Sequence, residues 1–71
     1  MAMSIVGNRV QELRLGAPKY TQQALADRLG VTRQTIISIE SRKYTPSLEL
    51  APRISRLFGK SVEEVFSLLE E

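Results

Sequence analysis

Residues 21–43 constrain the fold of this chain more than any other stretch, because two helix start signals stand there eleven residues apart. Thr21 and Thr32 each precede a segment with apolar residues at helical spacing, where a threonine hydroxyl caps the free N–H groups of a helix. Gly30 suits the left-handed residue that ends the first of these helices. The stretch therefore predicts two short helices joined by the three-residue turn Gly30-Val31-Thr32.

The rest of the chain also has the pattern of short helices. A first helix is predicted over residues 5–15, a fourth from the Ser47 cap to Gly59, and a fifth from the capping box that Ser61 begins. No segment alternates apolar and polar residues with a period of two, so we expect an all-α, compact five-helix bundle. The predicted core positions are Val6, Val10, Leu13, Ala24, Leu25, Leu29, Ile36, Ile39, Leu48, Ala51, Ile54, Leu57, Phe58, Val62, Val65, Phe66 and Leu69.

Pro52 breaks the pattern of the fourth helix. With Ser47 as the N-cap, Pro52 falls at the fifth helical position, where the missing N–H removes a backbone hydrogen bond and the ring crowds a carbonyl. We therefore expect this helix to be bent or to start irregularly at Pro52.

Length and composition limit the remaining possibilities. A chain of 71 residues has room for one domain, which we place over 1–71 with its core at about 5–67. It has no Cys and no His, which excludes disulfides, thiolate chemistry and the common zinc sites. We expect no enzyme activity, cofactor, metal or small-molecule ligand, because there is neither a carboxylate pair in an evident cleft nor a phosphate-cradling glycine loop.

The charges and the apolar runs bear on partners and location. Residues 1–48 carry seven basic and three acidic side chains, whereas residues 49–71 carry three basic and five acidic ones. Such a division suits a polyanion-binding face set apart from another surface, although many solvated surfaces are as uneven. No apolar run approaches the roughly 20 residues that span a bilayer, and the N-terminus lacks the layout of a signal peptide. We expect a cytoplasmic protein with no membrane partner.

The predicted third helix, residues 32–42, separates into two faces on a wheel of about 100° per residue. Arg and Gln match guanine and adenine edges in the DNA major groove, which admits one α-helix. A polar outer face is also ordinary in a small bundle, but helix, short turn and helix are the geometry of a DNA-binding motif. Ile37 could contact a thymine methyl or cover the edge of the core. The inner face holds Thr35, Ile36, Ile39 and Glu40, and the outer face holds Arg33, Gln34, Ile37, Ser38 and Ser41.

The run from Thr21 to Glu40, TQQALADRLGVTRQTIISIE, resembles the helix-turn-helix of the phage repressor/Cro family, the Xre-like regulators. The segments YTPSLEL at 44–50 and FGKSVEEVF at 58–66 are similar to helices four and five of that family, so the resemblance covers about 6–66. It implies a lambda-repressor-like fold. It also implies a sequence-specific regulator of transcription that inserts its third helix into the major groove of double-stranded DNA.

The resemblance also implies roles for individual residues. Arg14 and Glu40 match a buried ion pair that ties the first helix to the third. Ser41-Arg42 stands where members often have Asn-Gly, so we expect a different turn there and an added phosphate contact from Arg42. The loop that contains Pro18 is one residue longer than usual. The implied base contacts are Arg33, Gln34, Ile37 and Ser38, and the implied contacts to the DNA backbone are Gln22, Thr32, Ser41, Arg42, Lys43 and Tyr44.

One recognition helix covers only a few base pairs, so selectivity in a genome calls for two half-sites. We therefore expect a homodimer that represses transcription from a palindromic operator, with Leu68 and Leu69 as the dimer contact. Two other classes of function remain. An antitoxin-like or other protein-interaction module could use the same fold. RNA binding is less favoured, because only two Tyr and two Phe are present for stacking on bases.

Overall fold

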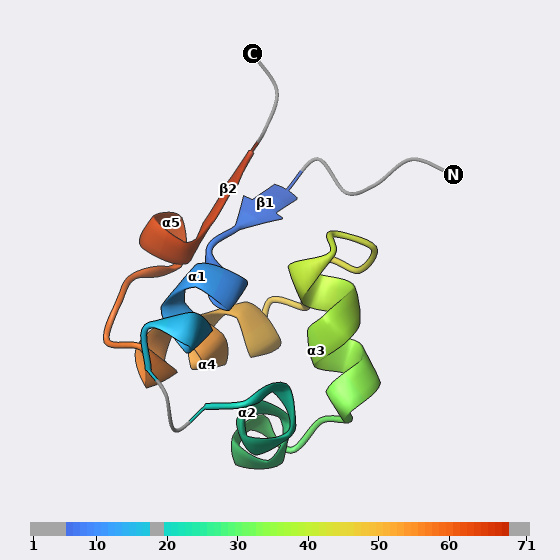
Figure 1. Ribbon diagram of the computed structural model, residues 1–71. Helices are drawn as coiled ribbons and strands as arrows, with labels where there is room; N and C mark the ends of the chain where they lie inside the picture. Colours follow the sequence, from blue (N-terminus) through green and yellow to red (C-terminus); the bar gives the residue numbers. More distant parts are fainter. Residues whose placement is uncertain (1–5, 18–19, 69–71) are drawn as a thin grey trace.

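The structure is a computed structural model that describes residues 6–17 and 20–68. Within them the helices are α1 (Val10–Leu15), α2 (Gln22–Leu29), α3 (Arg33–Glu40), α4 (Leu50–Leu57) and α5 (Val62–Val65). Two short strands, β1 (Val6–Asn8) and β2 (Phe66–Leu68), pair at the two ends of the described chain. α3 lies along one side of the molecule, with α2 near one of its ends and the β1–β2 sheet near the other (Figure 1). The predicted five-helix fold is confirmed, and the sheet is a small addition to it.

The two central helices form as their caps predict. Thr21 Oγ1 accepts the N–H of Ala24 at 3.0 Å, and Thr32 Oγ1 accepts the N–H of Thr35 at 3.2 Å. Gly30 has a φ of 73°, and the following residue, Val31, donates its N–H to the carbonyl of Ala26 at 3.0 Å. This is the left-handed helix end in which glycine avoids a Cβ penalty. α2 and α3 are therefore joined by a short turn that hydrogen bonds hold at its start and caps hold at both helices.

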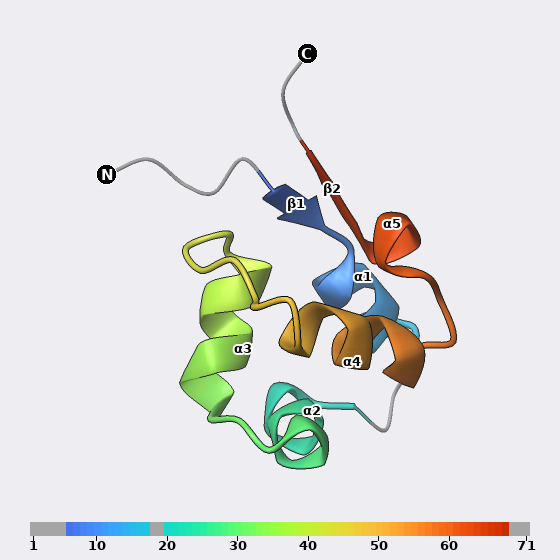
Figure 2. The same ribbon diagram turned by 180° about the vertical axis from the view of Figure 1, so that it is seen from behind.

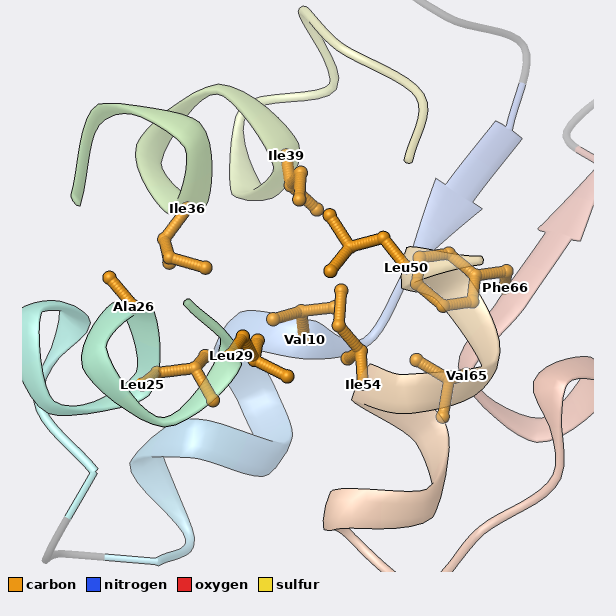
Figure 3. Close-up of a cluster of buried hydrophobic side chains, with 10 residues drawn as sticks. All are labelled: Val10, Leu25, Ala26, Leu29, Ile36, Ile39, Leu50, Ile54, Val65 and Phe66. Atoms are coloured by element: carbon orange, nitrogen blue, oxygen red, sulfur yellow. The ribbon is translucent and has the colours of Figure 1, made fainter. Parts of the chain in front are cut away.

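The core draws apolar side chains from every helix and from β2, and these side chains converge in Figure 3. Burial of Ile36 and Ile39 fixes the inner face of α3 against the rest of the molecule, which leaves its opposite face for solvent. The ten buried apolar residues are Val10, Leu25, Ala26, Leu29, Ile36, Ile39, Leu50, Ile54, Val65 and Phe66.

The ends of the chain differ from the prediction. The first helix begins at Val10, not near residue 5, and the fifth ends at Val65. Antiparallel pairing joins the segments beyond them, with Val6 opposite Leu68 and Asn8 opposite Phe66. Two segments that are far apart in the sequence satisfy each other's backbone groups here, and strands of three residues are too short to show a period of two.

The start of α4 also differs from the prediction. Ser47 Oγ accepts the N–H of Leu50 at 3.0 Å, but residues 48 and 49 form a turn and the helix begins at Leu50. Leu48 is consequently 94% exposed instead of buried, and Leu50 occupies the core in its place. The irregular start expected here is present, but Pro52 stands at the third helical position. Its missing N–H is harmless there, because the first N–H groups of a helix have no partner within the helix.

Within the described residues, no helix has the length and apolar content required to cross a membrane.

Candidate nucleic-acid interface

The first turn of α3 presents two long polar side chains to solvent. Arg33 and Gln34 are both exposed, and Gln34 Nε2 lies 3.5 Å from the hydroxyl of half-buried Ser38, one turn further along. Thr32, the cap of the helix, is exposed beside them. The buried side chains on the opposite face hold the helix, so this polar row stands on a rigid support. Its donors and acceptors match those of base edges in the major groove.

Ile37 lies at the border between the polar row and the body of the molecule. It is half-buried and lines a shallow depression between α1 and α3, together with Gln11, Gln22, Glu40 and Ser41. Its side chain therefore covers the seam between the two helices and keeps part of its apolar surface accessible at the edge of the polar row.

Glu40, at the end of α3, connects three helices. Arg14 of α1 donates through Nε to Glu40 Oε2 at 2.7 Å, and its side chain is 11% exposed while that of Glu40 is 5% exposed. Gln22 of α2 donates through Nε2 to Glu40 Oε1 at 3.2 Å. Because both charges are largely out of water, each depends on the other, and the pair sets position more than it adds stability.

A polar concavity lies where the N-terminus of α2 meets the start of α3. Arg33 Nη2 is 3.5 Å from Gln22 Oε1, so the amide of Gln22 is held between Glu40 on one side and Arg33 on the other. The free N–H groups of the first turn of α2 carry the positive end of the helix dipole. The concavity is thus suited to an anion of phosphate type. Its lining residues are Arg14, Thr21, Gln22, Gln23 and Arg33.

The loop after α3 begins with a left-handed residue that is not glycine. Arg42 has a φ of 63°, its N–H donates to the carbonyl of Ile39 at 3.0 Å, and the N–H of Lys43 donates to the carbonyl of Ser38 at 2.9 Å. These are the bonds of an ordinary glycine-type helix end, so the expectation of a different turn was wrong. An L-residue in this conformation costs about 1–2 kcal/mol. Ser41 and Arg42 are half-buried, whereas Lys43 and Tyr44 are exposed.

The two leucines expected at a dimer contact differ in what is described. Leu68 ends β2 opposite Val6 and is 60% exposed, while Leu69 lies outside the described residues. Pro18, in the longer loop between α1 and α2, also lies outside them.

A second group of arginines lies away from the polar row of α3. Arg28 of α2 and Arg53 and Arg56 of α4 line a depression beside the junction of these helices, and α4 faces the viewer in Figure 2. Arg53 Nη2 donates to the carbonyl of Leu29 at 2.9 Å, where a cation compensates the negative end of α2. These three arginines therefore form a basic surface separate from the polar row of α3, a separation that the order of charges along the sequence does not show.

Asn8 is a residue of this region that the sequence patterns missed. It ends β1, and its Nδ2 donates to the carbonyl of Ile39 in the last turn of α3 at 3.0 Å. Its Oδ1 accepts the first N–H of α1, from Val10, at 3.0 Å. An Asn side chain commonly accepts the backbone N–H two residues further on, and that local pattern could have predicted the second bond but not the first.

Comparison with known proteins agrees with this arrangement. A protein-family model described as helix-turn-helix matches residues 10–65, which include all five helices. A stretch of 46 residues is 56% identical to an uncharacterized HTH-type transcriptional regulator of Methanocaldococcus jannaschii and covers 65% of this chain and 70% of that protein. The uncharacterized HTH-type transcriptional regulator YgzD of Bacillus subtilis is 47% identical over 64 residues, which cover 90% of this chain and 96% of that protein.

A solved structure shows the same fold. The crystal structure of a Bacteroides fragilis protein that is proposed to bind DNA matches with a TM-score of 0.74 and 24% sequence identity, over 87% of this chain and 98% of that chain. The family match and the two relatives together confirm the resemblance expected from residues 21–40. The chain belongs to the Xre-type, lambda-repressor-like helix-turn-helix family of DNA-binding transcriptional regulators, which are not enzymes.

Proposed function

We propose that this protein acts in the cytoplasm as a homodimeric repressor that binds a palindromic operator with α3 in the major groove. The observation that carries the proposal is the polar row of exposed Arg33 and Gln34 and half-buried Ser38 on a helix whose opposite face is buried. A helix held in this way can place its polar side chains against base edges without first becoming ordered.

The base contacts follow from the chemistry of each side chain. Arg33 suits the O6 and N7 atoms of guanine, and Gln34 suits the N6 and N7 atoms of adenine. Ser38 can bond either base, and the accessible edge of Ile37 suits a thymine methyl group. Both Arg33 and Gln34 lie in the first turn, the part of a recognition helix that enters the groove most deeply.

Contacts to the DNA backbone are proposed on both sides of α3. On one side the concavity at Gln22 offers free helix N–H groups and the Arg33 guanidinium to a phosphate, with Thr32 close to the same turn. On the other side the loop presents Ser41, Arg42, Lys43 and Tyr44. Phosphate contacts on two sides would fix the depth and register of the helix but carry no sequence information themselves.

The dimer and the mode of regulation rest on general arguments. Two copies related by a two-fold axis read a palindrome and multiply the discrimination of one short helix. The exposed Leu68 gives an apolar contact at the sheet, with Leu69 beside it in sequence. A dimer seated on an operator excludes other proteins from it, so repression follows from binding alone.

Selection of bound duplexes from a random DNA pool tests this proposal. The expected result is an enriched palindrome whose half-sites are centred about one helical turn, 10–10.5 base pairs, apart. Titration of the selected duplex at several salt concentrations then gives the affinity and its salt dependence. Enrichment of a single half-site would contradict the dimer, and a pool that stays random would contradict sequence-specific reading.

A further inference from the structure

Asn8 uses both ends of its side-chain amide to join parts of the chain that are far apart. Nδ2 donates to the carbonyl of Ile39 in α3, 31 positions away, and Oδ1 accepts the N–H of Val10 at the start of α1. The side chain is half-buried. This bond joins β1 directly to the last turn of α3.

The carbonyl that Asn8 reaches belongs to the strained end of α3. The same oxygen of Ile39 accepts the N–H of Arg42, the residue in the left-handed conformation. A non-glycine residue persists in that conformation when its surroundings hold it there. The amide of Asn8 is therefore one of the groups that hold the turn from which Lys43 and Tyr44 leave the helix.

The position of Asn8 is itself set by the two ends of the chain. Asn8 stands opposite buried Phe66 in the sheet, and the next N–H, from Arg9, donates to the carbonyl of Val65 at 2.9 Å. β2 lies on the side of β1 that faces away from α3 (Figure 1), so the pairing with β2 anchors Asn8 independently of that helix.

We propose that Asn8 is a positioning residue for DNA binding. Through the carbonyl of Ile39 and the turn at Arg42, it sets the path of the loop that brings Lys43 and Tyr44 to the DNA backbone. The inference rests on the proposed function, because it needs α3 in the groove and this loop on phosphates.

The location of Asn8 predicts a specific kind of defect. Arg33 and Gln34 lie at the end of α3 opposite to Ile39, the residue whose carbonyl Asn8 reaches. Loss of the Nδ2 donor should therefore weaken binding to all sequences alike and leave discrimination at the bases that Arg33 and Gln34 contact unchanged. A lost phosphate contact also flattens the dependence of affinity on salt by about one ion.

The substitution Asn8→Ser separates this role from others. It is neutral, it keeps an oxygen that can accept the Val10 N–H, and it is too short to reach Ile39. As a control, Ser61→Ala removes the capping box of α5, away from α3, and should lower thermal stability alone. We expect Asn8→Ser to weaken binding about two- to tenfold on every duplex, to flatten the salt dependence, and to speed amide exchange at Arg42 and Lys43.

The reverse pattern would overturn the inference: a lower melting temperature with unchanged affinity and salt dependence would make Asn8 merely structural.

A double-mutant cycle adds a second test, because Arg42→Gly adopts the left-handed turn without strain. The effect of Asn8→Ser on affinity should shrink in that background, and an equal effect in both backgrounds would refute the route through Arg42. If the unsubstituted protein binds no duplex, the proposed function itself fails. Amide exchange at Arg42 needs no DNA, so it still shows whether Asn8 holds this turn.

Discussion

Arg33 is the residue proposed to contact guanine, and Arg56 provides a matched control. Both are exposed arginines, but Arg56 lies on α4, away from the polar row of α3. We expect Arg33→Ala to lose about 1–3 kcal/mol of binding free energy at the selected operator and to relax specificity at one base pair. Arg56→Ala removes the same charge and should keep the sequence preference. Titrations with duplexes that differ at one position measure both effects, and equal behaviour of the two variants would contradict base reading by Arg33.

Arg42 offers a test of backbone strain that is independent of DNA. At most positions glycine is less stable than alanine because of its greater freedom in the unfolded chain, but a left-handed residue reverses the order. We expect Arg42→Gly to be about 1 kcal/mol more stable to unfolding than Arg42→Ala. Both variants lose the same side chain, so urea denaturation of the pair isolates the backbone term. If the alanine variant is the more stable, Arg42 does not hold a φ of 63° in solution.

Among the elements, the central helices could be predicted because their causes are local. Thr21, Gly30 and Thr32 each act on N–H or carbonyl groups within a few residues, so the sequence alone predicts the caps and the turn. The ends of the chain could not be predicted in this way. β1 forms because β2 lies beside it. α4 begins at Leu50, later than predicted, because residues 48–49 form a turn ahead of the helix.

The same distinction between local and tertiary causes applies to the candidate site. The exposure of Arg33 and Gln34 follows from helical periodicity, and the Arg14–Glu40 pair was expected only from family resemblance. The bond from Asn8 to Ile39 and the left-handed Arg42 depend on tertiary contacts that no local pattern reports. Sequence reasoning therefore located the polar row but not the groups that hold the end of its helix.

The capping box of α5 makes one element sensitive to pH. The N–H of Ser61 donates to Glu64 Oε1 at 2.7 Å, and this bond together with the Ser61 hydroxyl lowers the pKa of Glu64. A carboxylate whose pKa is lower in the folded protein stabilises the fold when the pH is above its ordinary pKa of 4.5. This stabilisation is lost as the pH falls from 4.5 through the lower pKa of the folded state.

We therefore expect the melting temperature to fall as the pH is lowered below about 4.5, and to fall less in Glu64→Gln, which keeps an acceptor without titrating. Part of the fall should remain, because the Arg9 guanidinium lowers the pKa of Glu12 in the same range. Thermal melts across this range, monitored by circular dichroism, check the prediction. Identical pH profiles for the two proteins would show that the Glu64 carboxylate does not cap α5.

For the molecule as a whole, the proposed dimer can be tested with two leucines of similar exposure. Leu68 at the sheet is 60% exposed, and Leu15 at the end of α1 is 65% exposed. We expect Leu68→Glu to raise the dimer dissociation constant about tenfold or more, because a charge would replace an apolar contact, while Leu15→Glu leaves it unchanged. Sedimentation equilibrium measures both constants. A dimer that tolerates the charge at Leu68 would have its interface elsewhere.

Pairing of β1 with β2 also has a consequence for how the chain reaches this state. Because Val6 meets Leu68, the sheet closes almost the entire polypeptide into one loop of roughly 60 residues, whereas α2 and α3 meet across a turn of three. Closing the longer loop loses more chain entropy, so the sheet should form after the helices and open before they melt. Opening of the sheet would release Asn8, so the entropy of this long loop also bears on the hydrogen bond from the Asn8 side chain to the end of α3.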